Sequence, residues 1–161
     1  MGSGKTSVLA EASDILTLRD IHHAAIDLDA LGLAHLPTPD INDEAMYRNL
    51  QSVCANYAAL GVTRLLLARA MEDRAELELC RKSVSPENVI ICRLTANLPT
   101  MQDRVKTRES GMLQQQFIDR VATLENILDS ARLEDFSLAN ENRLLNQVAL
   151  EMLTKAGWIT G

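Results

Sequence analysis

The chain has 161 residues, a length typical of a single domain, and it is large enough to bury a sizeable core. Its net charge of −6 and its aromatic content of 3% disfavour a general nucleic-acid surface or a base-stacking platform. A phosphate site in this chain would therefore be a local cationic pocket.

The three cysteines are widely spaced and odd in number, which indicates buried thiols in a reducing compartment; they are Cys54, Cys80 and Cys92. No apolar run is long enough to cross a membrane, and no signal peptide is recognisable. These features predict a cytoplasmic protein of one domain, residues 1–161, that does not bind membranes.

The first seven residues contain the second half of a Walker A phosphate loop, G-x-x-x-x-G-K-[ST]. In such a loop successive backbone N–H groups curl around a phosphate at the N-terminus of a helix. The residues expected to bind ATP in this way are Gly2, Ser3, Gly4, Lys5, Thr6 and Ser7. Lys5 would reach the β and γ phosphates, and the Thr6 hydroxyl would help to hold Mg²⁺. The alternative is a flexible Gly/Ser start left by cloning.

A P-loop ordinarily follows a buried apolar strand, and both that strand and the first glycine of the pattern would fall upstream of Met1. Two explanations remain open at this point. Met1 could be an internal residue of a longer chain, or the protein could lack its first strand. For the chain as printed, we expect low stability or a remodelled fold and weak ATP binding.

Hydrophobic periodicity predicts helices over residues 5–18, 42–60, 73–82, 98–109, 113–132 and 143–156. Short apolar runs at 23–29, 63–68, 89–94 and 135–139 predict strands, and 31–40 predicts a loop with Pro37 and Pro39. Asn42 and Asn97 are expected to open helices, and Gly61 and Gly157 to end them. Strands that alternate with helices favour an α/β fold with a parallel sheet, whose ligands bind beyond the carboxyl ends of the strands.

Asp27 and Asp29 lie at the end of the first predicted strand, two residues apart and therefore on one side of it. We expect Asp27 to hold a metal-bound water, and Asp29 to orient or deprotonate the hydroxyl that attacks the γ-phosphate. Solvated acids at a strand end are the alternative.

Arg104 and Arg108 lie on the same side of their predicted helix as the apolar Met101 and Val105. An inward-facing arginine needs an anionic partner, and ATP phosphates would serve. Structural ion pairs with Asp or Glu are the alternative. Gly111 could hinge this segment, about 98–132, as a lid that closes over the nucleotide.

Two further arginines are candidates for an anionic substrate, Arg69 after the second predicted strand and Arg48 on the helix after the proline loop. Residues 140–143 could border the adenine, although a polar turn is the simpler interpretation. Catalysis is assigned to none of the three histidines, His22, His23 and His35. Ala68 and Arg69 stand where a second Walker-type acid would follow a strand, which weakens a motor-type ATPase interpretation.

Together these residues resemble the small P-loop kinases of the shikimate, gluconate and adenylylsulfate kinase type, and bacterial proteins labelled AAA-family ATPases or nucleotide kinase-like. The resemblance rests on Gly2 to Thr6, on Asp27-Leu28-Asp29 and on the stretch from Arg104 to Glu109. It implies a three-layer P-loop NTPase sandwich with sheet order 2-3-1-4-5, a lid with arginines, and transfer of the γ-phosphate of ATP to a small molecule. In that order the first strand, absent here, would be central.

The leading hypothesis is therefore an ATP- and Mg²⁺-dependent phosphotransferase that acts on a small metabolite or nucleotide. Lys5, Asp29, Arg104 and Arg108 would be its catalytic residues. Two hypotheses remain beside it, a nucleotide-binding module without catalysis and a simple NTP hydrolase in which Asp29 positions water. The sequence reveals neither the phosphoryl acceptor nor the oligomeric state.

Overall fold

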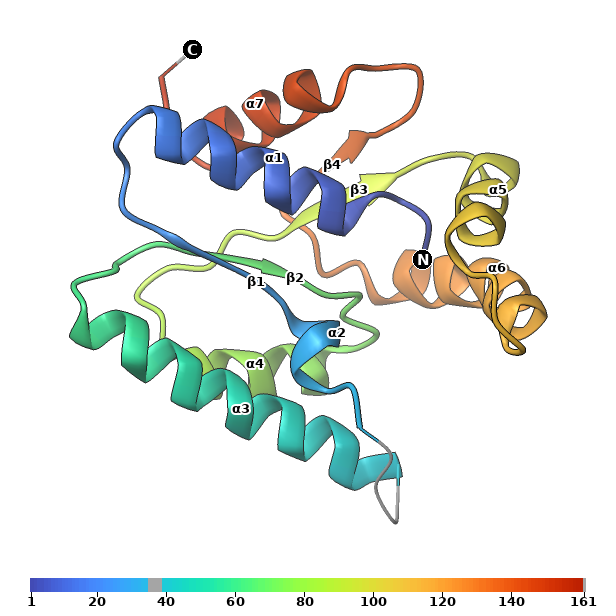
Figure 1. Ribbon diagram of the computed structural model, residues 1–161, viewed down its shortest axis with the longest axis horizontal. Helices are drawn as coiled ribbons and strands as arrows, with labels where there is room; N and C mark the ends of the chain where they lie inside the picture. Colours follow the sequence, from blue (N-terminus) through green and yellow to red (C-terminus); the bar gives the residue numbers. More distant parts are fainter. Residues whose placement is uncertain (35–38, 161) are drawn as a thin grey trace.

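The computed structural model describes residues 1–34 and 39–160, except for the side chains of residues 39–42. Within these ranges the chain is a mixed α/β structure in which short strands alternate with helices (Figure 1). Of the loop predicted over residues 31–40, the part with His35 and Pro37 lies outside the described residues. The ends of that range are helical, since one helix ends at Leu31 and another begins at Pro39.

The first helix, α1 (Lys5–Leu18), has the bounds that its sequence predicts. Val8, Ala12 and Leu16 recur at helical spacing, and all three are fully buried or nearly so. The helix begins directly after Gly4, whose backbone is left-handed (φ 88°), so the chain turns sharply at the helix start.

Four short strands form two separate parallel pairs. In the first pair β1 (Ala24–Asp27) runs beside β2 (Leu65–Ala68), and in the second β3 (Cys92–Thr95) runs beside β4 (Phe136–Ala139). Among the described residues no ladder joins β2 to β3. Each strand has four residues and is shorter than its apolar run predicts.

The first strand pair lies between two layers of helices (Figure 1). On one face Leu66 packs against the core of α1, and on the other Leu65 and Leu67 pack against α3 (Pro39–Ala59) and α4 (Arg74–Val84). The core of α1 also contains Leu94 of β3 and Leu153 of α7 (Leu145–Lys155). Helix α1 therefore contacts both strand pairs.

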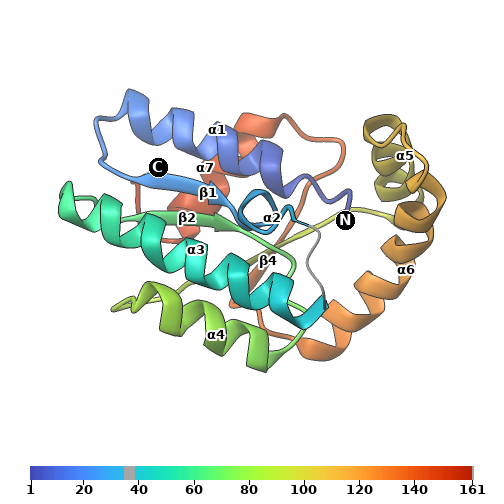
Figure 2. The ribbon, with the colours of Figure 1, turned by 60° about the horizontal axis from the view of Figure 1, so that its bottom comes forward.

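Helices α5 (Leu98–Arg108) and α6 (Gln114–Ala131) form an arm beside the strand pairs, as both views show (Figures 1 and 2). They share a small core around Met101, Val105 and Val121. The Asn97 side chain caps α5 by accepting a hydrogen bond from Thr100 N, as predicted. Met112, in the turn between the two helices, is fully exposed.

The predicted end of one strand and the predicted start of one helix are wrong. The strand predicted over 23–29 ends at Asp27, and Asp29 lies instead in a short helix, α2 (Leu28–Leu31), which the Asp27 side chain caps. The helix predicted to begin at Asn42 begins at Pro39, so Asn42 is not its cap. Proline suits such a start because the first turn of a helix leaves its N–H groups unpaired.

Candidate functional site

The loop before α1 depends on its two glycines. Gly2 and Gly4 both have positive φ, 73° and 88°. A Cβ at Gly2 would lie 2.3 Å from the carbonyl oxygen of Met101, and one at Gly4 would lie 2.2 Å from Nδ2 of Asn140. The loop can therefore take this path between α5 and the end of β4 only with glycine at both positions.

A hydrogen bond joins the start of α1 to the end of β1. The Thr6 hydroxyl donates to Oδ2 of Asp27 at 2.6 Å, across 21 residues of sequence. The other carboxylate oxygen of Asp27 accepts from the backbone N–H of Asp29 at 3.2 Å. The structure thus brings together the two residues that the sequence assigns to the metal.

Lys5 occupies the first position of α1, and burial lowers the pKa of its ammonium group. The carboxylates of Asp29 and Asp27 act in the opposite direction, and the positive charge of Arg108 again lowers the pKa. These opposed influences mean that Lys5 shares its surroundings with both predicted acids and with one predicted lid arginine. A desolvated ammonium beside these groups would gain from the approach of an anion.

The two predicted lid arginines differ in their contacts. Arg104 is half-buried and donates to two backbone carbonyls, that of Gly2 at 3.2 Å and that of Asn140 at 2.8 Å. Arg108 is exposed and pairs with the neighbouring Glu109 at 2.8 Å. Both line a cleft of about 390 Å³ along α5, whose other lining residues are Thr100, Asp103 and Thr107. Through these two hydrogen bonds Arg104 supports the backbone of the loop before α1.

Arg69 follows β2 and is surrounded by carboxylates. Its Nε donates to Glu76 at 2.9 Å, its Nη1 to Asp29 at 2.8 Å and its Nη2 to Asp43 at 3.2 Å. Burial alone would lower the pKa of this guanidinium, but the hydrogen bonds to Asp29 and Glu76 outweigh burial and raise it. Arg69 is consequently a permanent cation that already holds the carboxylate predicted to bind the acceptor hydroxyl.

Glu76, which the sequence analysis did not single out, anchors this cluster. Its carboxylate is only 14% exposed and accepts from Arg69, from the Tyr47 hydroxyl at 3.2 Å and from the backbone N–H of Glu72 at 2.9 Å. A local signal was present, since Asp73 and Glu76 have the spacing of a helix-capping pair, and Asp73 does accept from Glu76 N. The contact between Glu76 and Arg69 depends on tertiary structure, and no local sequence pattern predicts it.

Other predicted residues lie outside this arrangement. Arg48 is exposed and pairs with Glu44 one helical turn away. His23 bridges Ile21 O and the Ser13 hydroxyl, both at 2.8 Å, at the start of β1 and so at the opposite end of the strand from Asp27.

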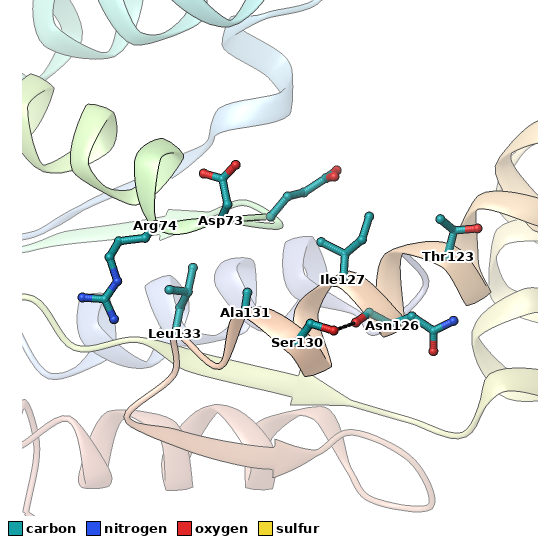
Figure 3. A pocket seen from close by; sticks show the side chains of 9 residues that line it. Asp73, Arg74, Thr123, Asn126, Ile127, Ser130, Ala131 and Leu133 are labelled. Carbon is teal, nitrogen blue, oxygen red and sulfur yellow. Dashed lines mark hydrogen bonds between the residues drawn. The ribbon is translucent and has the colours of Figure 1, made fainter.

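A wider cleft of about 640 Å³ separates the start of α4 from α6 (Figure 3). Figure 3 shows Asp73 and Arg74 on one side and Ile127, Ser130 and Ala131 on the other. None of the residues predicted to bind phosphate or metal lines it. We therefore do not take this cleft as the phosphate site.

The oxygen donors at Thr6 and Asp27 suit Mg²⁺, which prefers hard ligands and usually takes few of them from the protein. Among residues 1–34 and 39–160, no cluster of three or more His, Cys, Asp or Glu side chains could hold a metal by itself. A magnesium ion at this position would therefore complete its coordination with water and phosphate oxygens.

Within the described part of the chain, no helix is long and apolar enough to span a membrane. No protein-family model matches the sequence, and no curated protein matches it either.

Proposed function

We propose that the protein is an ATP- and Mg²⁺-dependent phosphotransferase that acts on a small molecule. The observation that carries this proposal is the 2.6 Å hydrogen bond between the hydroxyl of Thr6 and the carboxylate of Asp27. This bond joins the helix that follows the glycine-containing loop to an acid at the end of β1. A magnesium–triphosphate site needs both parts, a loop at a helix N-terminus and a nearby carboxylate.

In this proposal the loop N–H groups and Lys5 bind the phosphates of ATP, and Arg108 closes on them from α5. Thr6 and Asp27 hold Mg²⁺, which when bound neutralises charge on the phosphate oxygens. Asp29 orients the acceptor hydroxyl and takes up its proton. Arg69 holds Asp29 in place, and Arg104 holds the loop.

A second candidate function is a nucleotide-binding module without catalysis. The contact between Arg69 and Asp29 at 2.8 Å favours it, because a carboxylate oxygen already bound to a guanidinium is occupied and less available to an acceptor hydroxyl. Simple ATP hydrolysis, with Asp29 positioning a water molecule, remains a further outcome to be tested.

The decisive experiment incubates the protein with Mg²⁺, γ-labelled ATP and a metabolite extract. A labelled small molecule supports the phosphotransferase, labelled free phosphate supports the hydrolase, and ATP binding without turnover supports the module. The Lys5→Ala variant should lose phosphoryl transfer while retaining its circular dichroism spectrum. Transfer at the normal rate by this variant would refute the assigned role.

We further propose that the two strand pairs are parts of one P-loop sheet with the order β1, β2, an inserted strand, β3, β4. The parallel direction of both pairs and the contact of α1 with both support this order. A chain extended upstream of Met1 by an apolar strand should then melt at a higher temperature and bind ATP more tightly. An extension of equal length, with glycine and serine in place of the apolar residues, is the control. Equal melting temperatures for both would contradict the proposed order.

We also propose a cytoplasmic location, since Cys54, Cys80 and Cys92 are all free cysteines, as is usual in a reducing compartment.

A further inference from the structure

The polar side chain of Asn140 lies inside the protein, against the loop that precedes α1. Asn140 follows directly after β4 and is 6% exposed. Its Nδ2 donates to the carbonyl oxygen of Ser3 at 2.7 Å, across 137 residues of sequence. This is a buried hydrogen bond, so water cannot replace the donor if the side chain is removed.

The backbone of Asn140 is itself fixed. Its N–H donates to Thr95 O at 2.7 Å, which continues the β3–β4 ladder by one residue. Its carbonyl oxygen accepts from Nη2 of Arg104 at 2.8 Å, and Nη1 of the same guanidinium donates to Gly2 O. The loop is therefore held through two of its carbonyls, Gly2 O and Ser3 O, by groups anchored in α5 and in the second strand pair.

Holding these carbonyls has a consequence for the N–H groups of the same loop. Because peptide planes are rigid, a carbonyl directed into the protein directs the N–H of the following residue the other way. The donors from Asn140 and Arg104 thus turn the N–H groups of Ser3 and Gly4 away from these contacts, so that they are available to an anion.

We propose that Asn140 is a positioning residue for phosphate binding, acting through its hydrogen bond to Ser3 O. The identity of the ligand, a polyphosphate, rests on the proposed function. The hydrogen bond by which Asn140 holds the loop does not depend on that function. A polar turn residue that merely borders the adenine would not need a donor at this position.

The test measures the affinity of the whole chain for inorganic tripolyphosphate with Mg²⁺ in two variants. N140D keeps the shape of the side chain but cannot donate when ionised, so at pH 8 it should bind at least tenfold more weakly. Its carboxyl group regains a donor when protonated, so much of this loss should disappear by about pH 5, because burial raises a carboxyl pKa. Asn140→Ser, which is neutral and too short to reach Ser3 O, should bind weakly at every pH.

The matched control is N126D, which makes the same chemical change on the exposed side of α6 and should follow the pH profile of the unaltered protein. A loss in N140D that does not change with pH, or no loss in either Asn140 variant, would overturn the proposal.

Amide hydrogen exchange separates this inference from the proposed function. The N–H of Val8 donates to Gly4 O at 2.9 Å, so release of the loop should speed its exchange. If the unaltered chain binds no tripolyphosphate, the phosphotransferase fails, while faster exchange at Val8 in N140D than in N126D still supports the hold on the loop. Equal exchange in the two variants would contradict it.

Discussion

The two sides of the candidate site are held together by different forces. The loop before α1 is held by glycine geometry and by hydrogen bonds to two of its carbonyls, from the Asn140 amide to Ser3 O and from the Arg104 guanidinium to Gly2 O. The Arg69 cluster is held by ion pairs with Asp29, Asp43 and Glu76. The first arrangement depends on shape and tolerates changes of salt and pH, whereas the second depends on charge and does not. The phosphate side of the proposed site is therefore the rigid side, and the acceptor side is the adjustable one.

The largest effect is expected from Gly4→Ala, which tests the dependence of the loop on shape. Both Gly4 and Gly61 have positive φ, 88° and 84°, but only Gly4 has a neighbour where a Cβ would stand. Gly61→Ala should cost about 1–2 kcal/mol of unfolding free energy through backbone strain alone. Gly4→Ala should cost about 1–3 kcal/mol more because it also displaces Asn140, and should abolish polyphosphate binding. Urea denaturation of both variants measures the difference, and equal losses would mean that the close contact is not needed.

The next largest effect tests the dependence of the Arg69 cluster on charge. Glu76→Gln replaces a largely buried carboxylate that accepts three hydrogen bonds, and should cost about 1.5–3 kcal/mol of unfolding free energy. Glu78→Gln is the control, since the Glu78 side chain is 49% exposed and pairs with Arg81, three residues further along the helix. Its loss should stay below about 0.5 kcal/mol. If both variants denature at the same urea concentration, Glu76 is not the anchor.

A smaller effect is expected where the two sides meet, at Lys5. Burial lowers the pKa of Lys5 below its ordinary value of 10.5, so the folded state binds fewer protons than the unfolded state between these two pKa values. The unfolding free energy should therefore rise with pH in that window. Lys5→Met should flatten this part of the profile and raise stability at neutral pH. A profile unchanged by the substitution would show that Lys5 is not desolvated.

The smallest effect is expected from an exposed ion pair, which shows how little charge contributes without burial. The hydrogen bond from Arg143, at 2.7 Å, lowers the pKa of the Glu151 carboxyl below its ordinary value of 4.5. A lowered carboxyl pKa stabilises the fold above that ordinary value, and this contribution is lost as the pH falls through the folded pKa. Arg143→Ala should remove only this acid-dependent part of the stability. A loss of equal size at pH 7 and at pH 3 would contradict the linkage.

The elements with strong local signals could be predicted from the sequence. Helix α1 has its predicted bounds because apolar spacing and a left-handed glycine act within a few residues of one another. The strand ends were less predictable, since each depends on the length of the partner strand. The position of Asp29 is not predictable from the apolar run for a different reason. The Asp27 side chain caps α2 and so ends the strand before it reaches Asp29.

Within the candidate site, the sequence predicts which residue types gather, and the fold decides which of them bind one another. Thr6 and Asp27 do meet, as their motif positions predict. Arg104 donates to two backbone carbonyls, and its position on the apolar side of α5 does not predict those contacts. The contacts of Glu76 with Tyr47 and of Asn140 with Ser3 link segments distant in sequence, and such contacts have no local pattern.

The fully exposed thioether of Met112 has a practical consequence. Met46 and Met101 are 1% and 2% exposed, so mild peroxide should convert Met112 to its sulfoxide long before either of them. The rate of that oxidation, followed by mass spectrometry, would register any molecule or movement that shields the tip of the α5–α6 arm. Met112 oxidation thus reports on the exposure of that tip without an added label.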